Sequence, residues 1–316
     1  MIAHINFLTV LNIILMKWVK SDLKSNTNSG NIINMEGSDR GLHLFKILKI
    51  LISVILPVVI LSGSLYAFPK LEGTRWLWVY GEYLDTETIK EIAPNIVILS
   101  SDLYTENAIK SINEANITTL AHIPIGIVYN DSPLYLKVNF KPWVLGATGK
   151  IRIGHMVRVW LSPGWRDILG DYIEKDVMSK GFSGIFIDAD LPYKMFYDHR
   201  QDILDFISDV AGRFRSDFRD SPIVVFGDYD ILKRDDIVRN IDGFAVDGVW
   251  WSESRTRISS DESRQRLDLL HAAQGYGLSA LVIDYPDLPG DRIEVSNEAD
   301  SQGFILYIPS PYWGRF

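Results

Sequence analysis

The stretch that decides the fold is GFSGIFIDAD, residues 181–190. Its centre, Ile185-Phe186-Ile187, is a short apolar, β-branched run that is typical of a strand in a parallel sheet. The run ends at Asp188, and Asp190 follows two residues later. Carboxylates placed directly after a parallel strand indicate a site at the carboxyl edge of the sheet.

Similar runs recur on both sides of this stretch and alternate with amphipathic segments, which is typical of βα units. Residues 72–316 number 245, close to the roughly 250 of a (β/α)8 TIM barrel, so the sequence predicts this α/β fold. We predict eight strands, at Trp76–Tyr80, Ile96–Ser100, Thr118–Ile123, Gly184–Asp188, Ile223–Phe226, Gly243–Trp250, Ala280–Asp284 and Phe304–Ile308. We predict seven helices, at Thr86–Ala93, Glu106–Glu114, Gly164–Ser179, Gln201–Phe218, Ile231–Asn240, Ser260–Tyr276 and Arg292–Asp300.

One connection, Pro124–Pro163, is much longer than the others and carries Trp143, Trp160 and a candidate extra strand, Arg158–Leu161. Long connections that follow barrel strands lie at the carboxyl ends of the strands, where active sites are built. We therefore expect this connection to lie over the barrel mouth.

An uncharged apolar run, Ile50–Phe68, precedes the predicted barrel, and its 19 residues are about enough to span a bilayer core. Lys46 and Lys49 come just before it, which predicts a cytoplasmic amino terminus and an external barrel. An uncleaved anchor is favoured over a cleaved signal because Leu65 is large where a small residue is preferred before Ala67. A buried core helix is the remaining alternative.

These features divide the chain into residues 1–45, 46–69 and 70–316. The first segment contains a Ser/Asn/Gly-rich stretch typical of disorder, and translation from Met35 would leave most of it out of the working protein. The second is the anchor or signal, and the third is the barrel.

Charge and residue counts exclude several kinds of partner. The net charge is -8, but residues 1–71 hold seven basic and three acidic residues, so the remainder carries -12. Such an acidic domain argues against a nucleic-acid partner, since phosphate binding needs a basic face. There is no cysteine, and the six scattered histidines lack ligand spacing, so neither a metal nor another cofactor is predicted.

Two acids that follow predicted strands are the candidate catalytic pair, Asp188 and Glu253. They follow the fourth and sixth strands, and alternate strands contribute to the same barrel layer, so the two side chains could face each other across the mouth. We expect Trp250 and Trp251 to dehydrate Glu253 and raise its pKa, which would suit a general acid. Alternatively, Asp188 caps a helix or turn, and Glu253 pairs with Arg255 on the surface.

Further acids and aromatic residues near the predicted strand ends are candidates for binding substrate, because aromatic rings stack on sugars. Packing remains the default role of any single tryptophan, and Asp284 could form a turn instead. The substrate-binding candidates are Tyr80, Asp102, Trp160, Asp190, Trp250, Trp251, Asp284 and Tyr285, with Trp313 as a further sugar platform.

Residues from about Arg75 to Gly314 resemble glycoside hydrolase family 114, the endo-α-1,4-polygalactosaminidase-like barrels. The resemblance rests on blocks in matching order: Trp165-Arg-Asp167, Gly181-Phe-Ser-Gly-Ile-Phe-Ile-Asp188, Asp247-Gly-Val-Trp-Trp-Ser-Glu253-Ser254, Val282-Ile-Asp284-Tyr285 and Gly303-Phe-Ile-Leu-Tyr307. It implies a TIM barrel that hydrolyses an α-linked, amino-sugar polysaccharide.

Two departures from the family pattern bear on activity. The chain has Gly126-Ile127 where the family has Gly-Glu, and Phe226-Gly227 where it has Asn-Gly. Polar groups are thus lost at the active-site end. The sequence leaves two functions open: an extracytoplasmic glycosidase whose substrate is a cationic polysaccharide, and a non-catalytic anchored barrel that binds glycan or a partner protein.

Overall fold

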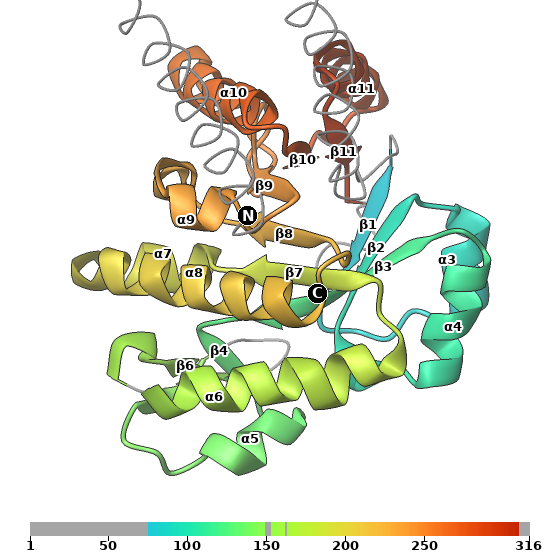
Figure 1. Cartoon of the computed structure of the whole chain (residues 1–316). Helices are drawn as coiled ribbons and strands as arrows, with labels where there is room; N and C mark the ends of the chain where they lie inside the picture. The colour runs from blue at the N-terminus through green and yellow to red at the C-terminus, as the bar shows by residue number, and fades with distance from the viewer. Residues whose placement is uncertain (1–74, 149–152, 162, 310–316) are drawn as a thin grey trace, which may run out of the picture. The chain divides into compact units, whose positions relative to one another are not determined.

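The computed structural model describes residues 75–148, 153–161 and 163–309 (Figure 1). The predicted anchor, the segment before it and Trp313 lie outside these residues. Within the described ranges, no helix is both long and apolar enough to cross a membrane.

Eight parallel strands form the centre of the structure, in the order in which they occur along the chain (Figure 1). A parallel bridge between Arg75 and Leu306 joins the first strand to the last, so the sheet closes on itself as a barrel. Trp76 strengthens this closure, because its indole Nε1 donates to the carbonyl oxygens of Ile305 and Val282, at 3.0 and 3.2 Å. The strands are β1 Trp76–Val79, β2 Ile96–Leu99, β3 Thr118–Pro124, β7 Gly184–Asp188, β8 Ile223–Phe226, β9 Gly243–Asp247, β10 Ser279–Ile283 and β11 Ile305–Tyr307.

The strand register divides the barrel interior into layers. In an eight-stranded barrel of shear 8, each step to the next strand shifts the level by one residue, and alternate strands fill a layer. By this rule Trp78, His122 and Phe226 share one layer. Their rings do meet, since the centroid of Trp78 lies 5.2 Å from that of His122 and 5.5 Å from that of Phe226. The next layer toward the carboxyl ends contains Asp188 and Asp247.

Helices cover the outside of the barrel, and polar caps begin several of them. Asp85 Oδ1 accepts from the backbone N–H of Thr88 at 2.9 Å, and Thr105 and Ser259 cap later helices in the same way. The α-helices around the barrel are α3 Thr86–Ile92, α4 Glu106–Glu114, α6 Pro163–Tyr172, α7 Asp190–Met195, α8 Arg200–Asp217, α9 Asp235–Val238, α10 Ser260–Gly275 and α11 Pro289–Gln302.

Two predicted helices are broken in the structure. The helix predicted at Gly164–Ser179 is α-helical only to Tyr172, after which a π-helical turn and a 3-10 turn complete it. The helix predicted at Ile231–Asn240 is a 3-10 turn followed by α9, because Arg234 between them has extended backbone angles.

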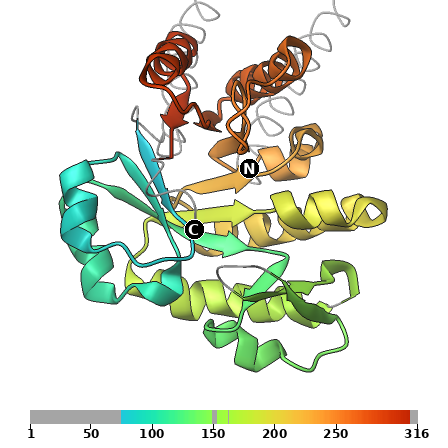
Figure 2. The same cartoon turned by 180° about the vertical axis from the view of Figure 1, so that it is seen from behind.

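The long connection after β3 forms a small three-stranded antiparallel sheet in the order β4-β6-β5, with one helix (Figure 2). Its elements are β4 Ile127–Tyr129, α5 Pro133–Val138, β5 Val144–Thr148 and β6 Gly154–Val157. The predicted extra strand was misplaced, since the strand ends at Val157 and residues 159–161 form a 3-10 turn. The hydroxyl of Tyr129 lies 2.7 Å from that of Tyr80, which follows β1, so this sheet contacts the carboxyl end of the barrel as expected.

Candidate active site

Asp188 ends β7 at the carboxyl end of the barrel and is oriented by His122 of β3. The Nε2 atom of His122 lies 3.0 Å from Asp188 Oδ2, and the histidine side chain is buried whereas the carboxylate is 15% exposed. The other carboxylate oxygen, Oδ1, accepts from the backbone N–H of Asp190 at 3.3 Å. Asp188 therefore keeps access to the mouth while both its oxygens are held.

Two further carboxylates lie close to Asp188. Burial raises the pKa of Asp190 to about 6, although Lys194 Nζ, 2.8 Å away, opposes the shift; the negative charges of Asp247 and Asp188 add to the rise. The pKa of Asp190 thus depends on the charges of Asp188 and Asp247, the two acids of the top interior layer. The mouth therefore contains three neighbouring carboxylates, and the charges of two of them act on Asp190.

A cavity of about 630 Å³ adjoins these acids on the side of α10. Its wall combines acids from the strand ends with two cations, Lys194 and Arg266. Arg266 Nη1 donates to the backbone carbonyl of Asp247 at 2.9 Å and also contacts that of Gly248, so it fixes the end of β9. A Cβ at Gly248 would meet this guanidinium, and the residue has a φ of 63°, which favours glycine.

The backbone turn at Gly248 also ends β9 at Asp247, three residues before the predicted end at Trp250. Trp250 is only 9% exposed and belongs to the core, which favours packing over the predicted role as a sugar platform. Apolar packing explains its position.

The surroundings of Asp284 favour the turn role that the sequence left open beside substrate binding. Its side chain is fully buried, and it accepts from the backbone N–H groups of Trp250, Trp251 and Tyr285, at 2.9, 2.6 and 3.0 Å. Burial raises its pKa to about 6 despite these hydrogen bonds. The carboxylate anchors the segment after β9 to the end of β10, and no substrate can reach it.

Glu253 lies in an exposed turn between β9 and α10. The predicted dehydration of its carboxylate by Trp250 and Trp251 was therefore wrong, because the turn carries the side chain away from the core. The surface pairing with Arg255 is not found either, since Arg255 forms its ion pair with Asp287.

The aromatic residues at the rim differ in how much of their surface is free. Tyr80 is 40% exposed and its ring lies 5.5 Å from that of His122, so it stands beside Asp188. Tyr285 is half-buried, and burial raises the pKa of its hydroxyl, with smaller contributions from the charges of Asp247 and Glu253. Tyr285 therefore lies within electrostatic reach of both Asp247 and Glu253.

Trp251 is also half-buried, and the guanidinium of Arg257 lies 5.7 Å from its ring centroid. The other two candidates are engaged by neighbouring groups. One face of Trp160 is covered by His199, whose ring stacks on it at 3.8 Å. Asp102 accepts from the hydroxyl of Tyr172 at 2.6 Å and so faces α6.

Sequence reasoning missed His122 and Asp247. Asp247 could have been found from its place directly after an apolar strand run, the signal that identified Asp188. His122 lies inside its predicted strand, where only the register with β7 shows that its ring meets Asp188.

Two solved glycoside hydrolase domains are similar to the described barrel. The glycoside hydrolase domain of PelA from Pseudomonas aeruginosa is 14% identical with a TM-score of 0.61, and the match covers 75% of this chain and 95% of that domain. Aspergillus fumigatus Ega3, solved in complex with galactosamine, is 16% identical with a TM-score of 0.61, and the match covers 79% of this chain and 96% of that protein.

The barrel has the fold of the family 114 glycoside hydrolases. The fold implied by the sequence resemblance is thus confirmed. Neither the family models nor the curated proteins contain a match to the chain.

The two departures from the family pattern occupy apolar surroundings. Phe226 is 6% exposed and stacks on Phe186 with ring centroids 6.0 Å apart, directly below the layer of Asp188. Ile127 is buried against Tyr129 and Met156 in the small sheet. Both side chains therefore pack instead of offering polar groups to the mouth.

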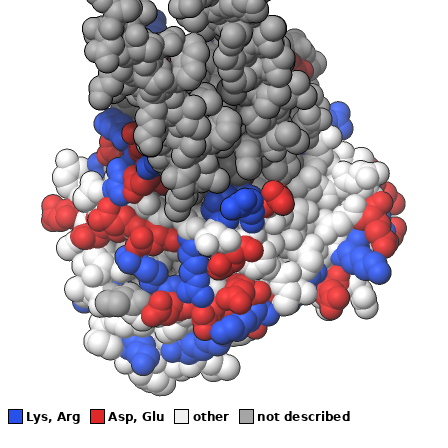
Figure 3. Space-filling view, viewed as in Figure 1, with Lys and Arg blue, Asp and Glu red and all other residues white. Residues whose placement is uncertain are grey.

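Charges on the face seen in Figure 3 are mixed, with acidic and basic side chains interleaved. Many of the acids are paired: Asp171, for example, lies 2.8 Å from Lys175 and 3.0 Å from Arg213. The excess negative charge of the barrel is therefore not a uniform acidic coat on this face.

Proposed function

We propose that the chain is a glycoside hydrolase that cleaves an α-linked polysaccharide of the amino-sugar class outside the cytoplasm. The observation that carries the proposal is Asp188, a carboxylate that is 15% exposed and is held by His122 at the carboxyl end of the fourth barrel strand. In TIM-barrel enzymes, this end of the strands supplies the catalytic residues.

Hydrolysis of a glycosidic bond needs two carboxyl groups with different tasks. One donates a proton to the leaving oxygen, and the other activates water or attacks the anomeric carbon. Asp188, which accepts hydrogen bonds through both oxygens, suits the ionised role.

Glu253 is the proposed acid. It lies after the sixth strand, and its charge contributes to the raised pKa of Tyr285. Its exposed turn can bring the carboxyl group onto a bound substrate. Unliganded geometry does not rule out such a group, because catalytic hydrogen bonds often form only with substrate. Asp247, in the same barrel layer as Asp188, is the competing partner.

The acids at the mouth favour a cationic sugar. The charges of Asp188 and Asp247 both act on Asp190, and a cluster of acids concentrates ligands of the opposite sign. The similar Ega3 structure holds galactosamine, whose amino group is cationic near neutral pH, and this supports an amino-sugar polymer as the substrate class.

The proposed location follows from the sequence alone. Residues 50–68 would anchor the barrel on the outer face of the membrane, or direct its secretion if the segment is cleaved.

Three substitutions test the mechanism in the purified full-length chain, with a panel of polysaccharides as substrates. We expect Asp188→Asn and Glu253→Gln each to reduce turnover by about 100–10,000-fold, the usual value of acid–base assistance, with little change in melting temperature. We expect Asp247→Asn to cost less. Glu91→Gln, an exposed change on α3 far from the mouth, is the control and should retain activity.

The outcomes separate the candidate partners. A large loss in Asp247→Asn with an active Glu253→Gln would transfer the acid role to Asp247. An active Asp188→Asn variant would contradict the proposal.

A non-catalytic glycan-binding or protein-binding barrel is the second candidate. It is favoured by Phe226, an apolar ring beneath the mouth where the family pattern has a polar residue. Under this alternative, polysaccharide binds to the chain, measured by calorimetry, but no reducing ends appear.

A further inference from the structure

A small cavity adjoins His122, on the side of β2, β3 and α6. Its volume is about 30 Å³, and its wall includes Ser100, Asp102, His122 and Tyr172. A site of about 10–15 Å³ can hold one water molecule if it also offers two to four polar partners. The cavity therefore has room for a water and a polar lining to bind it.

Ser100 supplies the first sign that something occupies this space. The residue is 4% exposed, and its Oγ atom has no hydrogen-bond partner among the described residues. A buried hydroxyl without a partner costs roughly 1–3 kcal/mol, so such groups are normally satisfied by protein or by ordered water.

His122 supplies the second sign. Its Nε2 lies 3.0 Å from Asp188 Oδ2, so Nδ1 is the ring nitrogen left for a second partner. A neutral imidazole donates from one nitrogen and accepts at the other, so the partner of Nδ1 decides whether Nε2 carries the proton. The ring lines the same cavity as Ser100.

We propose that one ordered water in this cavity bridges Ser100 Oγ and His122 Nδ1, and so fixes the histidine tautomer that donates from Nε2 to Asp188. The water donates to Nδ1 and accepts from the serine hydroxyl. His122 is then a positioning residue, which holds Asp188 at the mouth without touching substrate. The effect on turnover rests on the proposed glycosidase function, whereas the water and the tautomer do not.

The rest of the cavity wall is compatible with this arrangement. Tyr172 donates to Asp102 Oδ1 at 2.6 Å and lies 2.5 Å from Ser101 Oγ, so its hydroxyl proton is already used. The Asp102 carboxylate can accept the second proton of the water. The groups that face His122 from packed elements are Trp78 of β1, Tyr80 just after β1, Phe186 and Asp188 of β7, and the cavity residues.

Nitrogen-15 NMR of the imidazoles tests the tautomer directly in the full-length chain. We expect His122 to show a protonated Nε2 and an unprotonated Nδ1. His155 is the internal reference, because its Nδ1 lies 3.0 Å from the carbonyl oxygen of Leu145 and must carry a proton to donate. A protonated Nδ1 on His122 would overturn the proposal.

Ser100→Ala separates a bridging water from an unpartnered hydroxyl. If the water bridge exists, the variant should convert the His122 signals from one tautomer to an exchanging mixture, and melting temperature should fall. If the hydroxyl has no partner, removing it should leave His122 unchanged and raise the melting temperature, and this outcome would refute the bridge.

Two substitutions of His122 test positioning. His122→Gln keeps an N–H near the Nε2 position, whereas His122→Phe fits the aromatic layer without a donor. A hydrogen bond to a charged group is worth roughly 1.5–3 kcal/mol, so kcat should fall about 10-fold or more in His122→Phe, with KM nearly unchanged and partial recovery in His122→Gln. Equal losses in both variants would contradict a positioning role. If the wild-type chain has no glycosidase activity, the NMR results still decide the water bridge.

Discussion

Asp284 illustrates at the scale of one residue how burial changes the task of a carboxylate. It follows a strand as Asp188 does, and the sequence gives no means of telling the two apart. By the barrel rule, Asp188 falls on the interior face of its layer while Asp284 falls on the outer face, where three backbone N–H groups meet it. One acid is available for chemistry, and the other holds a loop.

Burial of Asp284 predicts a pH dependence of stability. Its pKa is raised from 3.8 to about 6, so the folded chain binds this proton more tightly than the unfolded chain. Its contribution is complete below about pH 4 and is lost as pH rises through about 6. Relative to Asp284→Asn, the wild type should lose about 3 kcal/mol of unfolding free energy between these values.

Urea unfolding of both proteins at several pH values measures this difference. Asp220→Asn, at an exposed turn, is the control and should show no such relative change. A constant gap between wild type and Asp284→Asn from pH 4 to pH 7 would contradict the prediction.

Single residues also show where sequence reasoning stops. Asp188 could be predicted because an acid after an apolar strand is visible in the chain itself. The contact with His122 could not, because it joins residues 66 positions apart through strand register. The burial of Trp250 and exposure of Glu253 depend on the turn at Gly248, whose backbone angle the sequence does not display.

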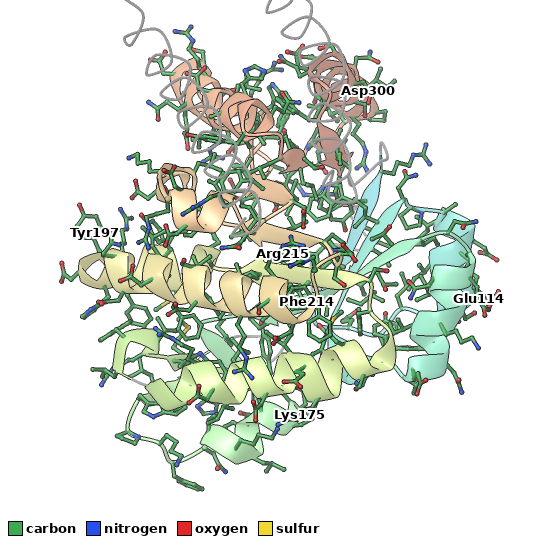
Figure 4. All side chains as sticks on the ribbon, viewed as in Figure 1. Glu114, Lys175, Tyr197, Phe214, Arg215 and Asp300 are labelled. Atoms are coloured by element: carbon green, nitrogen blue, oxygen red, sulfur yellow. The ribbon has the colours of Figure 1, made fainter. Side chains whose placement is uncertain are left out.

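At the scale of elements, the barrel strands were predicted well, since each is a short apolar run bounded by polar or glycine-containing segments. The small sheet was not predicted, because β4 and β6 pair across the whole length of their connection. Helix α8 packs against the barrel, with Phe214 and Arg215 near its carboxyl-terminal end (Figure 4). Tyr197 lies before the amino-terminal end of the helix and projects outward. Arg215 continues inward to Asp242, 2.5 Å away.

Strand β7 predicts a strict requirement for glycine at its first position. A Cβ at Gly184 would fall well inside van der Waals contact with the backbone oxygen of Pro222, which accepts from Ile185 at 2.9 Å. Because backbone cannot rotate away as a side chain can, Gly184→Ala should destabilise the fold by about 1–3 kcal/mol or more.

Chemical denaturation measures this loss. Gly290→Ala in α11 is the matched control, because a Cβ there meets nothing within 4 Å and alanine favours a helix. Gly290→Ala should therefore be neutral or stabilising. If Gly184→Ala were as stable as the wild type, β7 and β8 could move apart to accept the Cβ, and the prediction would be contradicted.

At the scale of the whole molecule, charge predicts how ligands bind. Residues 72–316 carry -12, and the acids Asp188, Asp190 and Asp247 lie at the mouth. Binding of a cationic amino-sugar oligomer should weaken as salt rises, because the Debye length falls from about 30 Å at 0.01 M to about 10 Å at 0.1 M. Calorimetry over this range checks it, and tighter binding of a matched uronate oligomer would reverse the proposed ligand charge.

The apolar run at residues 50–68 predicts membrane attachment of the full-length chain. After cell lysis the chain should sediment with membranes, and deletion of residues 1–69 should release the barrel. Full-length chain that stays in the supernatant with its original amino terminus would disprove the anchor.

The closure at Trp76 has a consequence for the order of biosynthesis. This indole donates to Ile305, 229 residues further along the chain. The edge of β1 that does not pair with β2 is therefore covered only when the last strand is in place. A nascent chain emerges from its amino terminus, and β1 is therefore an open template for wrong pairing throughout most of translation. The barrel therefore closes in one late step, when β1 meets β11. Chaperones that shield strand edges should matter more to its yield than those that bind helices.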